Sequence, residues 1–296
     1  MAAKNNGTRT TKRRRRTKKE INVLDAELQR IVAKFRPVTV RQVFYQAVNR
    51  GLVPKSESTG YRVVQRRLCV LREVRSILHG HIVDGTRYVH GHVRHRSLDE
   101  FTAYAAGSYR RDYWADSPVR VEVWLEKDAL TGVLRPTVVD ECGLNLYVTR
   151  GFASVSYLQE AAEEIELDGR PTYVYVLTDF DPSGISIAEK VEEELIGRAP
   201  STDITVERLA VNREQIDRWQ LSTRPTKPDD SRAKRFLQVH GTESVELDAI
   251  PPDALRRLVR EAIERHMNPW KLRQLRLIEE REREDFKMAF AHTYER

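Results

Sequence analysis

The chain has 296 residues, of which 40% are hydrophobic and 32% charged, and its formal net charge at pH 7 is +7. This length favours two ordinary domains, and the composition is polar but outside the range of disordered proteins. No stretch approaches the roughly 20 apolar residues that a membrane-spanning helix needs. The only cysteines, Cys69 and Cys142, fit neither a disulfide framework nor a zinc site. These features predict an intracellular protein, either cytoplasmic or associated with the nucleoid.

The basic excess lies entirely at the N-terminus. Residues 1–19 hold nine Lys or Arg and no acid, so the rest of the chain carries 42 basic residues against 44 acidic ones. The segment has no apolar periodicity, which predicts a disordered arm over residues 1–20 that binds nucleic-acid phosphates. A solvated terminus or a localisation signal is the plainer alternative. The side chains expected to contact DNA are Arg13, Arg14, Arg15 and Arg16.

Three amphipathic helices are predicted next, in a domain that spans residues 21–110. They cover about residues 21–35, 40–50 and 60–78, where apolar side chains recur at helical spacing. The segment "HIVDGTRYVHGHVRH" that follows is β-prone around two turns. Three helices and a basic hairpin predict a winged helix-turn-helix, with Arg62 and Arg66 on the outer face of its third helix as DNA contacts.

Alternating strands and helices are predicted from residue 119 onward, in a domain that spans 111–250. The expected strands lie at 119–126, 144–151, 172–181 and 204–211. This alternation predicts right-handed βαβ units and a parallel sheet that is covered on both faces. A polar loop with little secondary structure is expected at 213–245, and helices are expected at 251–296. The predicted fold class is α/β, preceded by a mostly α domain.

Three acids follow the ends of two predicted strands: Glu126 closes one, and Asp179 and Asp181 close another. Ligands of an open parallel sheet lie beyond the carboxyl ends of its strands, where converging carboxylates need a cation to offset their repulsion. Mg²⁺ suits such a set, with Mn²⁺ as a substitute, and the lack of Cys or His argues against Zn²⁺. Alternatively, Asp181 only caps the next helix.

The motifs around these acids resemble the Toprim domain, which is a Rossmann-like βαβ fold. Its signature is a Glu at the end of the first strand and Asp-x-Asp-x-x-Gly after a later one, matched here by "WLEK" and "DFDPSG". Toprim domains occur in topoisomerases, primases and some nucleases. Lys127, an expected DNA contact, and "RGFASVS" at 150–156 are similar more specifically to the A subunit of topoisomerase VI and the related meiotic break-forming transesterases.

The nucleophile of that family is the second aromatic residue of an Arg-Glu-Ile-Tyr-Tyr-like motif on a winged-helix domain. The segment "RQVFY" matches it at Arg41, Phe44 and Tyr45, with Gln42 in place of Glu. The helical pattern puts Tyr45 about 130° from the centre of the apolar stripe, so we expect its hydroxyl to be accessible. Arg41, one turn earlier, is expected to favour the phenolate and bind the attacked phosphate. A packing role for the tyrosine is the plainer alternative.

The resemblance covers about residues 30–250 and implies a compact DNA transesterase of the type called Mini-A. Tyr45 would form a covalent link to a DNA phosphate. In that family two chains form a dimer and each tyrosine works with the partner's metal site, so a double-strand break needs the homodimer. Strand passage driven by ATP would need a separate B-type subunit. The rivals are a Toprim nuclease that uses water and a non-catalytic DNA-binding protein.

Two further groups of polar residues leave alternatives open. Glu246 and Asp248 in "VELDA" either reach the same metal site or alternate along a short strand. The cluster of His90, His92 and His95 favours a loop that faces DNA over a metal clip.

Overall fold

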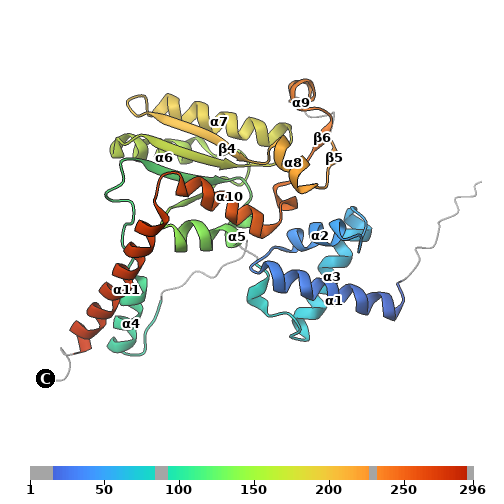
Figure 1. Ribbon diagram of the computed structural model, residues 1–296, viewed down its shortest axis with the longest axis horizontal. Helices are drawn as coiled ribbons and strands as arrows, with labels where there is room; N and C mark the ends of the chain where they lie inside the picture. Colours follow the sequence, from blue (N-terminus) through green and yellow to red (C-terminus); the bar gives the residue numbers. More distant parts are fainter. Residues whose placement is uncertain (1–15, 84–92, 227–231, 292–296) are drawn as a thin grey trace, which may run out of the picture.

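The computed structural model describes residues 16–83, 93–226 and 232–291, which form a helical unit beside a larger α/β unit (Figure 1). Several residues singled out from the sequence lie outside these ranges, namely Arg13, Arg14, Arg15, His90 and His92. In the described ranges no helix combines the length and the apolar character needed to cross a membrane.

The helical unit contains the three helices predicted for the first domain. They are α1 (Lys18–Phe35), α2 (Val40–Asn49) and α3 (Arg62–Glu73). Thr17 and Thr39 start the first two helices as N-caps, each within a capping box. α1 therefore begins before residue 20, where the basic arm was expected to end. A π-helical turn, η1 (Glu57–Tyr61), leads into α3, which ends earlier than predicted.

The hairpin predicted at residues 81–95 is described only in part. Within residues 81–83 and 93–95 there is no strand, and Ile82, after the short turn η2 (His79–His81), makes one isolated bridge with Val38. The structure thus has the helices of the predicted domain, whereas the wing is not seen in the described residues.

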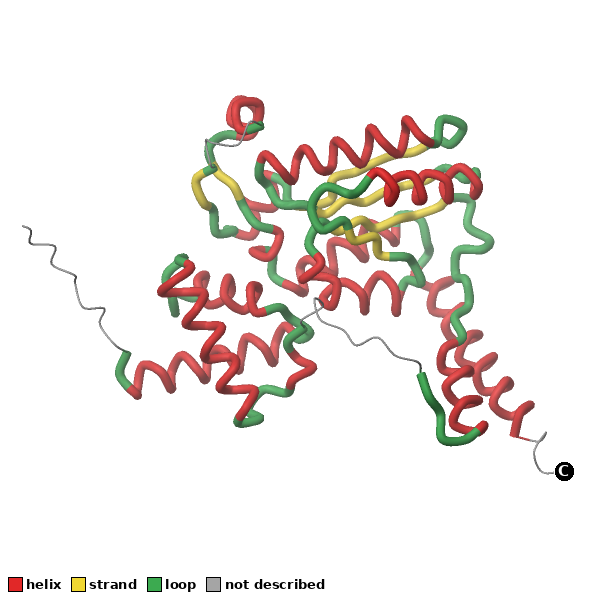
Figure 2. The backbone as a smooth tube through the Cα atoms, turned by 180° about the vertical axis from the view of Figure 1, so that it is seen from behind, coloured by secondary structure: helices red, strands yellow, loops and turns green. Residues whose placement is uncertain are grey.

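Helix α4 (Leu98–Ser108) falls inside the predicted first domain but packs elsewhere. It lies along α11 (Pro269–Ala291), and the two helices project together from the rest of the α/β unit (Figures 1 and 2). The buried Glu279 carboxylate accepts a hydrogen bond of 2.7 Å from the backbone N–H of Arg111, 168 positions away. Residues 98–108 are therefore grouped with the C-terminal helix rather than with α1–α3.

A four-stranded sheet forms the centre of the α/β unit and confirms the predicted parallel α/β fold. Its strands are β1 (Arg120–Leu125), β2 (Leu146–Val148), β3 (Thr172–Leu177) and β4 (Ile204–Ala210). Their order is β2-β1-β3-β4, and every neighbouring pair is parallel. Leu125 pairs with Leu177, so the two central strands end at the same level.

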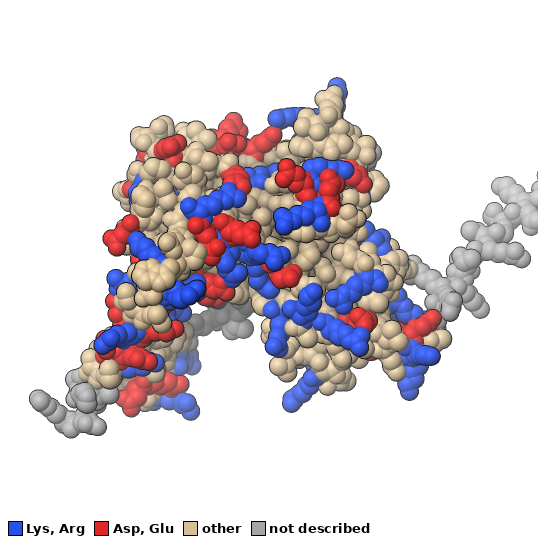
Figure 3. All heavy atoms as spheres, viewed as in Figure 1, with Lys and Arg blue, Asp and Glu red and all other residues tan. Residues whose placement is uncertain are grey.

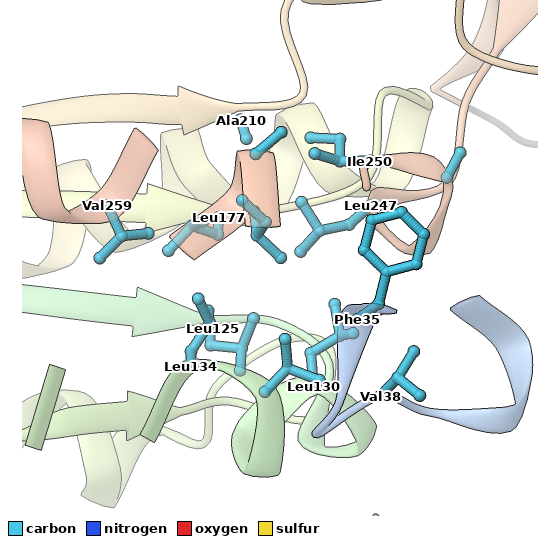
Figure 4. Close-up of a cluster of buried hydrophobic side chains, with 14 of the residues drawn as sticks. Phe35, Val38, Leu125, Leu130, Leu134, Leu177, Ala210, Leu247, Ile250 and Val259 are labelled. Carbon is cyan, nitrogen blue, oxygen red and sulfur yellow. The ribbon is translucent and has the colours of Figure 1, made fainter. Parts of the chain in front are cut away.

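Successive strand residues point to opposite faces of the sheet, and helices cover the apolar side chains on each face. Trp124, Val174 and Val176 pack under α6 (Val155–Asp168) and α7 (Pro182–Arg198). Leu125 and Leu177 join the cluster on the other face (Figure 4). The elements on that side are η3 (Asp128–Leu130), α5 (Thr131–Arg135), η4 (Pro136–Glu141) and α10 (Pro252–Glu264).

The expectation of a largely unstructured loop at 213–245 is wrong. The segment contains α8 (Arg213–Trp219), β5 (Arg224–Pro225), α9 (Ala233–His240) and β6 (Glu243–Ser244), followed by η5 (Leu247–Ala249). The short helices are stable here because Ile216 and Phe236 are buried against the rest of the unit. The antiparallel pair of β5 and β6 brings residues 246–248 toward the ends of the central strands.

The helical unit and the α/β unit share one hydrophobic core. Phe35, the last residue of α1, and Val38, in the segment before α2, lie among Leu130, Leu134 and other side chains beneath the sheet (Figure 4). From α10, the Arg256 guanidinium donates hydrogen bonds to the carbonyl oxygens of Phe35, at 3.2 Å, and of Pro37 and Val133. These contacts fix α2 close to the carboxyl ends of the strands.

Candidate functional site

The carboxyl ends of β1 and β3 bring two of the predicted acids into contact. The Glu126 carboxylate directly follows β1 and accepts a hydrogen bond of 3.0 Å from the backbone N–H of Asp179. Burial, reinforced by the charge of Asp179, raises the pKa of Glu126 to about 7. Burial also raises the pKa of Asp179. The two acids therefore lie where negative charge is poorly solvated.

Asp181, the third predicted acid, caps α7. Its Oδ1 accepts a hydrogen bond of 2.9 Å from the backbone N–H of Gly184, as the alternative interpretation of the sequence expected. Its Oδ2 lies 3.3 Å from Nη2 of Arg224. Gly184 is needed because the first turn of α7 approaches the end of β3: a Cβ there would lie 2.1 Å from the Asp179 carbonyl oxygen.

Residues 246–248 complete the site from the other side. Asp179 Oδ1 accepts a hydrogen bond of 2.8 Å from the backbone N–H of Leu247. This contact fixes Glu246 and Asp248, on either side of Leu247, next to the strand ends. The Oδ1 atom of the buried Asp248 has no hydrogen-bond partner among the described residues. Both acids therefore lie beside the strand ends, and their role as metal ligands stays a prediction.

Lys127 lies at the centre of these acids. Its ammonium nitrogen is 2.8 Å from Asp248, 2.9 Å from Asp179 and 3.5 Å from Glu246. Burial alone would lower its pKa, but the three carboxylates raise it, so the side chain stays charged. The side chain of Lys127 is directed into the acid cluster, and its role as a DNA contact stays a prediction. We call Glu126, Lys127, Asp179, Asp181, Arg224, Glu246 and Asp248 the strand-end cluster.

The three predicted metal ligands lie near one another, and two of them are held in ion pairs. Over the described ranges, no group of three or more His, Cys, Asp or Glu side chains is positioned to hold a metal ion. The reason is visible in the ion pairs: Lys127 binds Asp179, and Arg224 binds Asp181. In this arrangement Lys127 and Arg224 neutralise two of the acids that the sequence predicts as metal ligands, and the metal site stays a prediction.

Arg41 reaches the strand-end cluster from α2. Its Nε donates to Oε2 of Glu246 at 2.7 Å and its Nη2 donates to Oε1 at 3.1 Å, which is a two-point ion pair. Arg224 also approaches Glu246, at 3.3 Å. Burial raises the pKa of Glu246, but the hydrogen bond from Arg41 and the charge of Lys127 outweigh it and lower the pKa to about 2. Glu246 is therefore a stable carboxylate that links α2 to the acids.

Tyr45 lies one turn after Arg41 and is buried, with an exposed fraction of 3%. The prediction of an accessible side chain is wrong, because α2 is buried on more than one side: residues 42–47 are all buried, and η5 packs against this helix. Burial and the charge of Glu246 raise the pKa of its hydroxyl, whereas the charges of Arg41 and Lys127 lower it. The tyrosine is thus next to the strand-end cluster of its own chain.

Lys55 adds a further contact around the tyrosine. Its ammonium nitrogen lies 5.6 Å from the centre of the Tyr45 ring and donates hydrogen bonds to the carbonyl oxygens of Ser222, at 2.7 Å, and Thr223. Burial lowers the pKa of this lysine. Lys55 therefore joins the loop before α3 to the segment before β5, beside the candidate nucleophile.

The outer surface of the helical unit is basic. Lys and Arg side chains gather over α1–α3, whereas both signs of charge are mixed over the rest of the visible face (Figure 3). Arg62 and Arg66 are exposed on α3, as predicted, and line a surface pocket of about 840 Å³ together with Arg16. One guanidinium nitrogen of Arg16 donates to the Leu52 carbonyl oxygen at 3.3 Å.

Sequence reasoning missed Arg224 and Lys55 and left Glu246 and Asp248 undecided. The Glu-x-Asp spacing of "VELDA" was a usable signal for the two acids, since it repeats the spacing of Asp179 and Asp181. For the basic residues no comparable pattern exists, because their partners lie far away along the chain.

Fold and site together define an α/β protein with an ion-paired acid cluster at the carboxyl edge of a parallel sheet and a buried tyrosine beside it. The chain matches no model of a known protein family, and no curated protein matches it either.

Proposed function

We propose that this protein is a DNA-cleaving transesterase of the topoisomerase VI A type, with α1–α3 as the core of a winged-helix domain and the α/β unit as a Toprim domain. The observation that supports this most is the position of α2, whose Arg41 pairs with Glu246 of the strand-end cluster and whose Tyr45 lies beside that cluster. A tyrosine, an arginine and several carboxylates are the groups that tyrosyl transfer to a phosphodiester requires.

In the proposed reaction the Tyr45 oxygen attacks a DNA phosphorus atom. A P–O bond to tyrosine forms while the P–O bond to one sugar breaks, and the released sugar oxygen takes up a proton as the tyrosine loses one. Arg41 would bind the attacked phosphate with two parallel hydrogen bonds, as it now binds the Glu246 carboxylate. Because one phosphodiester replaces another, the reverse attack by the sugar hydroxyl reseals the strand.

The acids at the strand ends suit a divalent cation. Glu126 and Asp179 share a buried position, where burial first and the neighbouring charge of Asp179 second raise the pKa of Glu126, and a cation would relieve both effects. Glu126, Asp179 and Asp181 would hold Mg²⁺, or Mn²⁺ in its place. Bound there, the ion would stabilise negative charge on the attacked phosphate and on the leaving oxygen. Lys127 and Arg224 would have to release Asp179 and Asp181.

DNA binding in this proposal uses the basic surface of the helical unit. Arg62 and Arg66 on α3, with the arginines at residues 13–16, would contact phosphates, so that affinity falls steeply with salt. One chain cuts one strand, so a double-strand break requires a homodimer. Coupling to ATP would require a separate B-type subunit.

A hydrolytic nuclease is the second candidate, and the burial of Tyr45 favours it. A buried hydroxyl with a raised pKa is a poor nucleophile until its surroundings change, whereas water activated at the acids needs no tyrosine. The ion pairs of Lys127 with three acids also suit a non-catalytic DNA-binding protein.

One experiment separates these functions. The protein is incubated with end-labelled or supercoiled DNA and Mg²⁺ or Mn²⁺, stopped with detergent and analysed with and without protease. The transesterase leaves label on the protein until protease treatment, and Tyr45→Phe abolishes that label. Free ends that persist in Tyr45→Phe indicate the nuclease instead. Binding without any cleavage by the wild-type protein would contradict both enzymatic proposals.

A further inference from the structure

The surface pocket of about 840 Å³ on the helical unit is separate from the strand-end cluster. It lies between α1, η1 and α3, and no residue of the strand-end cluster lines it. Its volume is within the usual range of ligand sites, roughly 300–1,000 Å³. We call it the arginine pocket, after the four arginines that line it: Arg16, Arg62, Arg66 and Arg67.

Most of the positive charge of the arginine pocket has no acidic counterpart among the described residues. Arg67 is paired with Asp25, at 2.5 and 2.8 Å. Arg62 and Arg66 are exposed and form no ion pair with a described residue. The Nη1 atom of Arg16 is buried and has no hydrogen-bond partner within the described ranges. No described acidic side chain lines the pocket, so its charge favours an anionic ligand.

The walls of the pocket are apolar between these arginines. They are formed by the side chains of Ile21, Leu24, Pro54 and Val63. A small inorganic anion would leave these walls exposed to water, whereas a nucleotide brings both a flat base and a phosphate. Guanidinium groups bind phosphate oxygens in pairs and also stack against bases, so arginines suit both parts of a nucleotide.

The recessed shape distinguishes an unpaired nucleotide from one in a duplex. The bases of a continuous duplex are stacked inside the helix, and its outer surface presents phosphates and sugars. Only a base that leaves the stack can reach the apolar walls, and the cost of leaving is lowest for an unpaired base. Residues 1–15, which precede Arg16, hold six Lys or Arg and no acid, so the charge extends further than a single small ligand requires.

We propose that the arginine pocket binds an unpaired nucleotide of DNA, with its base against the apolar walls and its phosphates on Arg62 and Arg66. The inference rests on the proposed function only in the choice of DNA as the polyanion. It assigns a second DNA site, apart from the cleavage site, that recognises unpaired bases. The protein should therefore bind a locally unpaired duplex more tightly than a continuous one.

Three duplexes of equal length and charge test this preference in the wild-type protein. One is continuous, one has a short central bubble of opposed thymidines, and one has the same bubble built from abasic sites. Fluorescence anisotropy without divalent cations gives the dissociation constants. We expect the thymidine bubble to bind about fivefold or more tightly than either of the others. The abasic bubble is as flexible as the thymidine bubble but has no bases, so equal affinities for these two would overturn the proposal.

Val63→Ser tests whether the preference arises in the arginine pocket. We expect this variant to lose most of the preference for the thymidine bubble while its affinity for the continuous duplex is unchanged. Val23→Ser is the matched control, because Val23 lies on α1, is 55% exposed and does not line the pocket. A preference that persists in Val63→Ser would place base recognition elsewhere and overturn the proposal. If Val63→Ser does not fold, the comparison of the two bubbles in the wild-type protein still decides.

A competitor separates DNA from an acidic protein segment as the ligand. Polyglutamate that displaces the thymidine bubble as effectively as unlabelled bubble DNA, at equal concentration of charge, would overturn the proposal in favour of an acidic peptide. Failure of this site is also distinct from failure of the proposed function. A bubble preference without any tyrosyl–DNA link leaves the arginine pocket in place and removes the transesterase. A covalent link without the preference removes only the pocket.

Discussion

Arg41 and Glu246, 205 positions apart along the chain, are joined by two parallel hydrogen bonds of 2.7 and 3.1 Å. The arginine belongs to the helical unit and the glutamate precedes η5 of the α/β unit. The pair therefore couples the stability of the interface between the two units to the geometry of the candidate site.

A double-mutant cycle with Arg41→Gln and Glu246→Gln measures this coupling. Glu246→Gln removes the counter-charge of Arg41, and Arg41→Gln leaves Glu246 with only Lys127 and Arg224, so we expect each single substitution to lower the free energy of unfolding by about 1–3 kcal/mol. The double variant should lose less than the sum of the two, by about 1–2 kcal/mol. Urea unfolding followed by circular dichroism gives these values. The exposed pair Arg213 and Glu243 is the control, with a coupling of at most about 1 kcal/mol. Strictly additive losses would contradict the predicted coupling.

The lowered pKa of Glu246 also predicts that the free energy of unfolding depends on pH. The pKa of Glu246 is lowered to about 2 in the folded protein, against about 4.3 in an unfolded chain. A lowered carboxyl pKa stabilises the fold above the unfolded-state pKa, and this contribution disappears as the pH falls through the folded-state pKa. We therefore expect the difference in unfolding free energy between wild type and Glu246→Gln to be largest above about pH 5, up to about 3 kcal/mol. It should shrink between about pH 4 and pH 2. A difference that stays constant across this range would argue against the ion pair.

The order of strands and helices could be predicted because it depends on local patterns. Periodicity of apolar residues identified all four strands of the sheet and the helices α1–α3, although α1 begins before the predicted position and α3 ends before it. The short helices α8 and α9 were missed because their polar sequences become helical only when Ile216 and Phe236 are buried. Local pattern thus gives the fold class but not the segments that tertiary contacts stabilise.

The candidate site could be predicted only in part for the same reason. Glu126 and Asp179 were found because both follow strands, and parallel strands end at one edge of the sheet. The prediction that Tyr45 is exposed was wrong because a helical pattern identifies only the side of α2 that packs within the helical unit. It cannot show that η5, about 200 positions later in the chain, also packs against this helix. The partners of Lys127 could not be inferred from its position beside Glu126, since a basic residue at a strand end can turn toward DNA or toward acids.

Lys127 provides a prediction about metal binding that does not depend on catalysis. Lys127→Met removes the charge that three carboxylates share, so we expect the unfolding free energy to fall by about 3 kcal/mol or more. Millimolar Mg²⁺ should raise the thermal midpoint of this variant more than that of the wild type, because the ion replaces the ammonium charge. Differential scanning calorimetry with and without Mg²⁺ measures both effects. Lys190→Met, on the surface of α7, is the control and should show no added response. Equal responses in the two variants would rule out the strand-end acids as a cation site.

Gly184 gives the sharpest prediction for the structure around the acids. Its position requires the absence of a side chain, since a Cβ would lie 2.1 Å from the Asp179 carbonyl oxygen and 3.0 Å from the Asp179 backbone nitrogen. Gly184→Ala must push the first turn of α7 away from the end of β3, which displaces Asp179 and the Asp181 cap together, so we expect a loss of about 3 kcal/mol or more. Gly197→Ala, in the same helix with open space around the added methyl group, should be neutral or stabilise the protein by up to about 1 kcal/mol. Chemical denaturation of the two variants measures this contrast. Similar stabilities for both would mean that α7 does not approach β3 as closely as described, and the geometry proposed for the acids would have to be revised.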